Sequence, residues 1–134
     1  MYAVEIRDHV MIAHSLPHEA FGPAQKMHGA TYVVDLAFFR ERLGEAAVVV
    51  DIGLASQCLG AVLGEINYSN LDEAPAFAGR LSTTEAVARW IFDQMSAAIV
   101  AGRLGEDGRA VERLRVTLHE SHIARAWFEG PVAG

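Results

Sequence analysis

The feature that most constrains the fold is a helix start at residues 82–85, because it fixes where a long helix begins. Ser82 lies three residues before Glu85, and an apolar run follows. This spacing predicts a capping box, in which the Ser82 hydroxyl accepts from the amide of Glu85 and the Glu85 carboxylate accepts from the amide of Ser82. Apolar residues then recur every three or four positions, at Val87, Ile91, Met95 and Ala98. We therefore expect a buried amphipathic helix from this point to the neighbourhood of Gly102.

Two strand-like segments and another helix precede this helix, and two strands follow it. Alternation of apolar and polar residues predicts a first strand over Tyr2–His14, and Thr, Tyr, Val and Phe residues favour a second over Ala30–Phe39. Asp51 is a typical N-cap for the first helix. The apolar stripe of that helix consists of Leu54, Cys58, Leu59, Val62, Leu63 and Ile66. The last two strands are expected over Arg113–Leu118 and Ile123–Glu129.

The predicted order of elements is strand, strand, helix, helix, strand, strand. Pairing of consecutive strands gives an α+β fold, with a four-stranded antiparallel sheet and two helices packed on one face. We expect one domain over residues 1–134, because no repeat, low-complexity tract or long linker divides the chain. Such a sheet leaves two edges exposed, and assembly into an oligomer is one way to bury them.

Composition and charge argue against several classes of function. The formal net charge is −6 and no cluster of Lys and Arg is present, so we expect no nucleic-acid or membrane-surface partner. No apolar run reaches the roughly 20 residues of a membrane span, and the N-terminus lacks the pattern of a signal peptide. The single cysteine, Cys58, excludes an internal disulfide. We therefore expect a cytoplasmic protein.

Several short motifs follow one another along nearly the whole chain. They are Ala13-His14, His28-Gly29, Asn70-Leu71-Asp72, Pro75 with Phe77 and Ala78, Ser82-Thr83-Thr84-Glu85, and Glu120-Ser121. In this order the sequence resembles the 6-pyruvoyl-tetrahydropterin synthase family, which includes the bacterial 6-carboxytetrahydropterin synthases. The resemblance implies the tunnelling fold, in which subunits join their sheets into a barrel. It also implies a homohexamer of two stacked trimeric rings, with pterin sites between subunits.

The resemblance further implies a zinc site, which in the family uses one histidine of the first strand and two of a His-Gly-His motif. His14 and His28 match the first two ligands, but Ala30 occupies the third position. Three neutral imidazoles would leave zinc an open position for substrate. We therefore expect zinc binding to be weakened or lost, unless His18 or His9 supplies a substitute. The alternative is that His14 and His28 are half-buried polar residues with no metal.

The acid–base relay of the family consists of a cysteine shortly before His-Gly-His and an Asp-His pair. Here the loop Phe21–Met27 contains no cysteine, and Asn67 and Tyr68 occupy the Asp-His positions. Cys58 lies on the predicted apolar stripe of the first helix, which favours a structural thiol. Tyr68 remains a candidate catalytic proton donor, although a phenol with a pKa of about 10 is a poor base at neutral pH. The usual reaction of the family, that of a zinc-dependent carbon–oxygen lyase, is therefore not expected.

The residues that would recognise a ligand match the family better. Glu120 matches the glutamate that anchors the pterin, and Thr83 and Thr84 match the helix start that completes the polar edge of the pterin. One carboxylate can accept from both the ring N–H and the exocyclic amine of a 2-amino-4-oxo heterocycle. The alternative for Glu120 is a solvated charge at the end of a strand.

We therefore expect a protein that keeps the pterin pocket of the family and has lost or rebuilt its catalytic centre. One hypothesis is an enzyme that modifies a pterin by altered chemistry, for example aldol-type side-chain cleavage. A second is a catalytically silent oligomer that binds a pterin or purine. A third is an oligomer that kept the fold alone, and the match of Glu120 and Thr83 argues against it. The first two hypotheses stay open at this stage.

Overall fold

Two long antiparallel strands, β1 (Tyr2–His14) and β2 (His28–Arg40), form the centre of the sheet in a computed structural model that describes residues 1–132. They pair over their whole length, so that His14 lies opposite His28. β4 (Arg113–His119) pairs with β2, and β5 (Arg125–Pro131) pairs with β4, both antiparallel. The predicted α+β fold with four antiparallel strands is therefore confirmed.

A fifth strand, β3 (Ser69–Asn70), runs parallel to β1 and gives the sheet order β3-β1-β2-β4-β5. The sequence did not predict it, because two residues are too few to show an alternating pattern. The last strand begins two residues later than expected. Ile123 lies in the exposed turn between β4 and β5 and does not belong to the strand.

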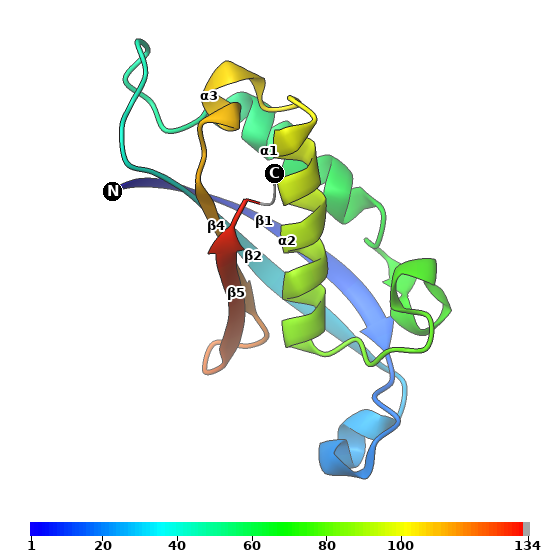
Figure 1. Cartoon of the computed structure of the whole chain (residues 1–134). Helices are drawn as coiled ribbons and strands as arrows, with labels where there is room; N and C mark the ends of the chain where they lie inside the picture. Colours follow the sequence, from blue (N-terminus) through cyan, green and yellow to red (C-terminus); the bar gives the residue numbers. More distant parts are fainter. Residues whose placement is uncertain (133–134) are drawn as a thin grey trace.

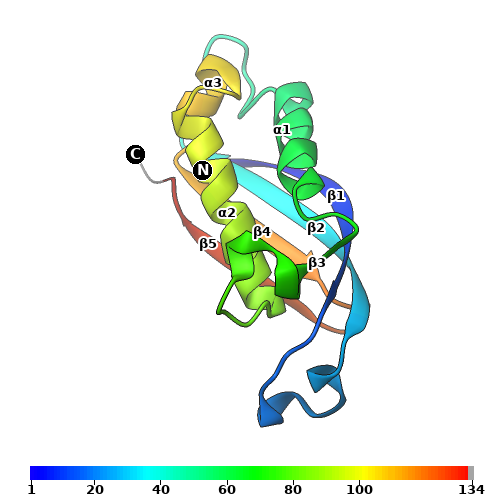
Figure 2. The ribbon, with the colours of Figure 1, turned by 90° about the vertical axis from the view of Figure 1, so that its right-hand side faces the viewer.

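Helices α1 (Ile52–Gly64) and α2 (Thr84–Val100) cover the same face of the sheet, as Figure 1 shows. In Figure 2 both helices lie between the viewer and the strands. A short helix, α3 (Gly105–Arg109), follows α2. Asp51 caps α1 as predicted, because its carboxylate accepts from the amide of Leu54 at 3.1 Å.

The predicted capping box at Ser82 is wrong by one residue. The N-cap of α2 is Thr83, whose hydroxyl accepts from the amide of Ala86 at 3.1 Å. Ser82 is buried and hydrogen-bonds to His14 instead. The run Ser-Thr-Thr offers several candidate caps in succession, and the long-range contact of Ser82 with β1 decides between them.

The core lies between the helices and one face of the sheet. Alternate residues of the strands point to this face, and the most buried of them include Val10, Tyr32, Leu36, Leu114 and Leu118. Leu59, Leu63, Ile91, Met95 and Ile99 meet them from the helices. Burial of each such aliphatic side chain contributes about 1.5–3 kcal/mol. Leu54 of the predicted α1 stripe is exposed, and Ala55 takes the buried position beside it.

Short 3₁₀ segments surround the end of the sheet where β1 stops and β2 starts. η1 (Glu19–Gln25) projects beyond the two strands at the lower right of Figure 1. η2 (Leu71–Glu73) and η3 (Pro75–Phe77) lead into the start of α2. Among residues 1–132, no helix is both long enough and apolar enough to span a bilayer.

Candidate functional site

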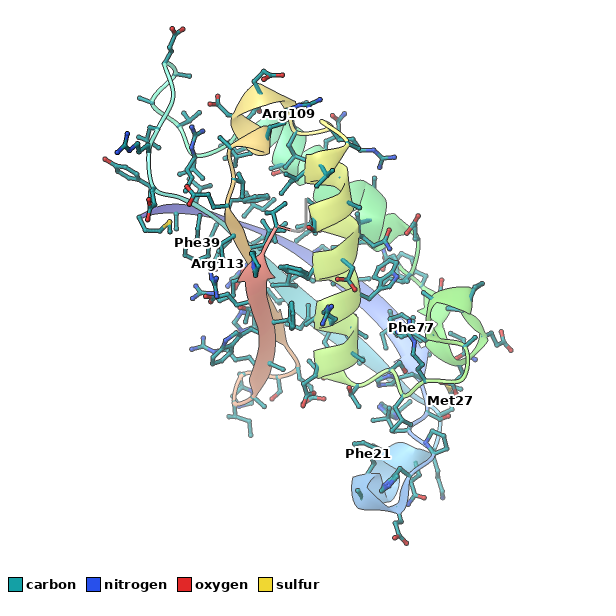
Figure 3. The ribbon with its side chains drawn as sticks, viewed as in Figure 1. Phe21, Met27, Phe39, Phe77, Arg109 and Arg113 are labelled. Carbon is teal, nitrogen blue, oxygen red and sulfur yellow. The ribbon has the colours of Figure 1, made fainter. Side chains whose placement is uncertain are left out.

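The candidate site lies where β1 ends, β2 begins and α2 starts. Figure 3 labels two residues of this region, Met27 just before β2 and Phe77 on the segment that leads to α2. The sheet register brings the two predicted metal ligands, His14 and His28, directly opposite each other. Their imidazole rings meet edge to face, with centroids 4.6 Å apart.

Both imidazoles are held by backbone carbonyls. His14 Nδ1 lies 2.8 Å from the carbonyl oxygen of Ser82 and 3.0 Å from its hydroxyl, and His28 Nδ1 lies 2.8 Å from the carbonyl oxygen of Lys26. Because a carbonyl can only accept, Nδ1 carries the proton in both rings and Nε2 keeps its lone pair. This arrangement is typical of histidines that bind a metal through Nε2. Burial lowers the pKa of His14, and so does the neighbouring His28, which favours the neutral, metal-binding form.

The described chain supplies only these two ligands. Ala30 lies opposite Ile12 and offers a methyl group in the third position. Neither suggested substitute lies with the pair. His18 Nδ1 accepts from the amide of Ala20 at 3.0 Å and caps η1, while His9 projects from the other face of β1. Among residues 1–132, no three His, Cys, Asp or Glu side chains are grouped to hold a metal ion. One chain therefore fits two of the four positions of tetrahedral zinc.

The motif Asn70-Leu71-Asp72 has a structural role in this chain. The side-chain oxygen of Asn70 accepts from the amide of Asp72 at 3.0 Å and caps η2. The carboxylate of Asp72 in turn accepts from the amide of Ser15 at 3.1 Å and from its hydroxyl. These bonds fasten the segment to the residue that follows His14.

The two residues in the relay positions lie along the edge of β1. Asn67 accepts through its side-chain oxygen from the amide of Met11 at 3.0 Å, and the amide of Tyr68 donates to the carbonyl of Met11 at 2.7 Å. The side chain of Tyr68 is 79% exposed. Within residues 1–132 its phenol makes no hydrogen bond or ring contact, so this chain does not bring it to the histidine pair.

The predicted ligand-binding residues meet at the start of α2. The Thr84 hydroxyl donates to Glu120 Oε1 at 3.0 Å, and the Thr84 side chain is buried. The other carboxylate oxygen of Glu120, Oε2, has no partner among the described residues. Thr83 is committed to capping the helix, so its hydroxyl oxygen already serves the amide of Ala86. Thr84 and Glu120 thus form a pair, and Thr83 supports the helix end beside them.

Sequence reasoning missed a third member of this cluster, Tyr32. It lies on the core face of β2 and is fully buried, yet its hydroxyl has no hydrogen-bond partner in residues 1–132. Burial raises the pKa of Tyr32, and the nearby Thr84 hydroxyl partly opposes this shift. Thr84 directs its own proton to Glu120, and no bond from Thr84 to the phenol meets hydrogen-bonding geometry. The signal in the sequence is a tyrosine flanked by Ala30 and Val34 on the core face of β2, since a buried phenol normally has a partner.

A cavity of about 340 Å³ opens next to this region. It is lined by Ser15, Pro17, Asp72, Phe77, Gly79, Arg80 and Leu81. Ser15 follows the end of β1 and Leu81 lies shortly before the start of α2, so the cavity lies at the same end of the sheet, although neither His14 nor His28 lines it. Its volume is at the lower end of the range of about 300–1,000 Å³ that small-molecule sites occupy.

Comparison with known proteins gives consistent matches. The sequence model of the family described as 6-pyruvoyl tetrahydropterin synthase matches residues 3–131. The 6-carboxy-5,6,7,8-tetrahydropterin synthase of Bacillus subtilis is 28% identical over 93 residues, which cover 66% of this chain and 62% of that protein. The match therefore spans less than two thirds of the length of this relative.

Solved structures with the same fold cover the chain almost completely. The 6-pyruvoyl tetrahydropterin synthase of Caenorhabditis elegans has a TM-score of 0.80 at 22% identity, over 96% of this chain and 95% of that one. The enzyme of the same name from Plasmodium vivax has a TM-score of 0.77 at 16% identity, over 98% and 100% of the two chains. At these identities the likeness establishes the fold.

Proposed function

The chain belongs to the 6-pyruvoyl tetrahydropterin synthase family and has its tunnelling fold, and on this premise we propose that it binds a pterin through Glu120 and Thr84. We further propose that it acts on this ligand by chemistry other than the usual lyase reaction. The observation that supports the proposal is the hydrogen bond from Thr84 to Glu120 at the start of α2.

This bond prepares the carboxylate for two adjacent donors. An ionised carboxylate has about four acceptor sites, so Oε1 can keep the Thr84 proton and accept one more, while Oε2 accepts another. The positive end of the α2 dipole attracts a negatively charged group placed beside it. Backbone amides in the first turn of the helix can donate to the carbonyl oxygen of a 4-oxo heterocycle. The combination suits the 2-amino-4-oxo edge of a pterin.

The residues in the relay positions support altered chemistry. The side-chain oxygen of Asn67 accepts from the backbone of β1, and the exposed Tyr68 phenol makes no hydrogen bond within residues 1–132. Cys58 is buried in the core, and burial raises the pKa of its thiol, so it does not replace the missing nucleophile. His14 and His28 supply two possible zinc ligands, and a zinc ion held there would act as a Lewis acid.

We also propose that the protein forms a ring-like homo-oligomer, most simply a hexamer. Both edges of the sheet support this, because β3 covers only Ile12 and Ala13 of β1, and β5 has no neighbour on its outer side within residues 1–132. Open edges of this length are normally paired or covered. A neighbouring subunit would also add residues to the site beside Glu120.

A second candidate function is silent binding of a pterin or purine. It is favoured by the two-ligand histidine site and by the position of Tyr68 away from it. Both candidates need the same pocket and differ only in turnover. Incubation with dihydroneopterin triphosphate and with unphosphorylated pterins, followed by chromatography of the products, separates them. Robust formation of a 6-pyruvoyl or 6-carboxy pterin would contradict the proposal of altered chemistry.

Calorimetric titration with neopterin and biopterin tests the pocket. Glu120→Gln keeps the size of the side chain but places an NH₂ where an acceptor is needed. Since charge-assisted hydrogen bonds contribute roughly 1.5–3 kcal/mol, affinity should fall about ten- to a hundredfold. Glu106→Gln is the matched control, because that carboxylate is exposed on α3. Equal affinities of wild type and Glu120→Gln, or no binding by the wild type, would refute the proposal.

A further inference from the structure

The face of the sheet opposite the helices carries its own pattern of charge. Strand alternation and register place four arginines here, Arg7, Arg113, Arg115 and Arg125. Three carboxylates share the face, Glu5, Asp35 and Glu129. Figure 3 labels two residues that mark it, Phe39 and its cross-strand partner Arg113, on the side of the ribbon away from α2. The protein as a whole has a net charge of −6, so a face with an excess of arginine stands out.

The centre of this face is fixed by Asp35. Its side chain is only 8% exposed and accepts from Arg7 Nε at 2.7 Å and from a second Arg7 nitrogen at 2.9 Å. It also accepts from His119 Nε2 at 2.7 Å. The hydrogen bond from Arg7 lowers the pKa of Asp35 against the opposing effect of burial, and His119 lowers it further. Arg7 therefore balances the negative charge of Asp35, and the His119 ring is held in one orientation, with no partner for its Nδ1 among residues 1–132.

A hollow of about 200 Å³ lies beside this cluster. It is lined by Glu5, Asp35, Arg115, Thr117, His119, Arg125 and Trp127. Arg125 makes no ion pair within residues 1–132. Arg115 is 3.7 Å from Glu5 and 4.0 Å from Glu129, both beyond hydrogen-bonding distance. The guanidinium groups of Arg115 and Arg125 therefore keep N–H donors that can serve a ligand in the hollow.

We propose that this hollow is a binding site for a small phosphate-type oxyanion, held by Arg115, Arg125 and His119. The arginine fork matches the geometry of phosphate oxygens. Nδ1 of His119 is an acceptor because Nε2 donates to Asp35, so it can accept a hydrogen bond from the P–OH group of a monoprotonated phosphate. The hollow is smaller than the roughly 300–1,000 Å³ of sites for drug-sized ligands, which suits an inorganic anion better than a pterin. The site lies on the other face of the sheet from Glu120 and does not depend on the proposed function.

Substitution of Glu5 should change the affinity for the anion in the opposite direction to substitution of an arginine. The Glu5 carboxylate lines the hollow, where it would repel an anion, and it also attracts the guanidinium group of Arg115. Glu5→Gln should therefore tighten binding, whereas Arg125→Gln should weaken it about tenfold or more, because a charge-assisted hydrogen bond is lost. A general effect of net charge would also weaken binding when an arginine far from the hollow is replaced, so a remote arginine distinguishes the two explanations.

Trp127 supplies the signal for the experiment, since it lines the hollow and is 57% exposed. The chain has two tryptophans, so Trp90→Phe leaves Trp127 as the only indole. The full chain in its native assembly would be titrated with inorganic phosphate and pyrophosphate at constant ionic strength, with chloride as the reference anion. Arg109→Gln on the exposed end of α3 is the matched control.

The proposal expects a saturable change in Trp127 fluorescence with phosphate or pyrophosphate and none with chloride. It expects weaker binding in Arg125→Gln, tighter binding in Glu5→Gln, and no change in Arg109→Gln. A linear or absent response, the same response to chloride, or equal affinities in all three variants would overturn it. Circular dichroism of each variant would establish that the sheet is retained. Arg115→Gln is a second substitution at the same site and should also weaken binding.

Discussion

The unpartnered phenol of Tyr32 leads to a prediction that separates stability from function. A buried hydroxyl without a hydrogen bond costs about 1–3 kcal/mol, and Tyr32→Phe removes this oxygen while keeping the ring that fills the core. We expect the variant to be more stable than the wild type by about 1–2 kcal/mol. For a chain of this length, each kcal/mol of added stability raises Tm by roughly 3–5 °C.

Urea unfolding at pH 7 measures this change directly, because the phenol is neutral there and burial raises its pKa further. The midpoint should rise while the slope m stays constant. Tyr2→Phe is the matched control, since Tyr2 is 53% exposed and its substitution should change stability by less than about 0.5 kcal/mol. Loss of stability in Tyr32→Phe would mean that the phenol donates to Thr84 in solution, and the reasoning would be refuted.

The same variant should bind a pterin more weakly, because the phenol lies next to the Thr84 hydroxyl that orients Glu120. A polar group that lowers stability and raises affinity is typical of a functional site. A gain in stability with unchanged affinity would assign Tyr32 to packing alone.

Three further predictions concern charge, metal and assembly. Asp35→Asn should lower the free energy of unfolding by about 1–3 kcal/mol at pH 7. Because Arg7 lowers the pKa of Asp35 in the folded state, the stability that Asp35 contributes is present above the unfolded pKa near 3.8 and is lost as pH falls below that value. The urea midpoints of wild type and variant should therefore converge at low pH. Ala30→His should raise zinc affinity in a chelator competition, since it adds an imidazole on the strand face of His28; unchanged affinity would remove the pair from the ligand set. Sedimentation at micromolar concentration should give an oligomer, and a monomeric mass would contradict the proposed ring.

The strands show how far local sequence patterns determine this fold. Alternation located β1 at Tyr2–His14, because a strand with one buried face repeats every two residues over a long run. β3 is too short for such a pattern and exists only because the segment after α1 lies against β1. The prediction of the α2 N-cap was wrong for a related reason. Ser82, Thr83 and Glu85 satisfy the local rules in more than one register, and the bond between Ser82 and His14, 68 positions apart, selects Thr83.

The site was predictable only in part. The pairing of Thr84 with Glu120 spans 36 positions, and family resemblance, not periodicity, drew attention to both residues. The resemblance also identified His14 and His28, which the register of β1 and β2 brings together. The sequence offered no reason to single out Tyr32, because a tyrosine on a core strand normally finds a partner, and only the packed structure shows that this phenol has none within residues 1–132.

A crystal structure of the protein with neopterin bound is the most direct test of the pterin pocket. We expect the ring N–H and the exocyclic amine to donate to the Glu120 carboxylate at about 2.7–2.9 Å, with the Thr84 hydroxyl still donating to Oε1. A pterin bound elsewhere, or one that contacts this region without using Glu120, would contradict this expectation.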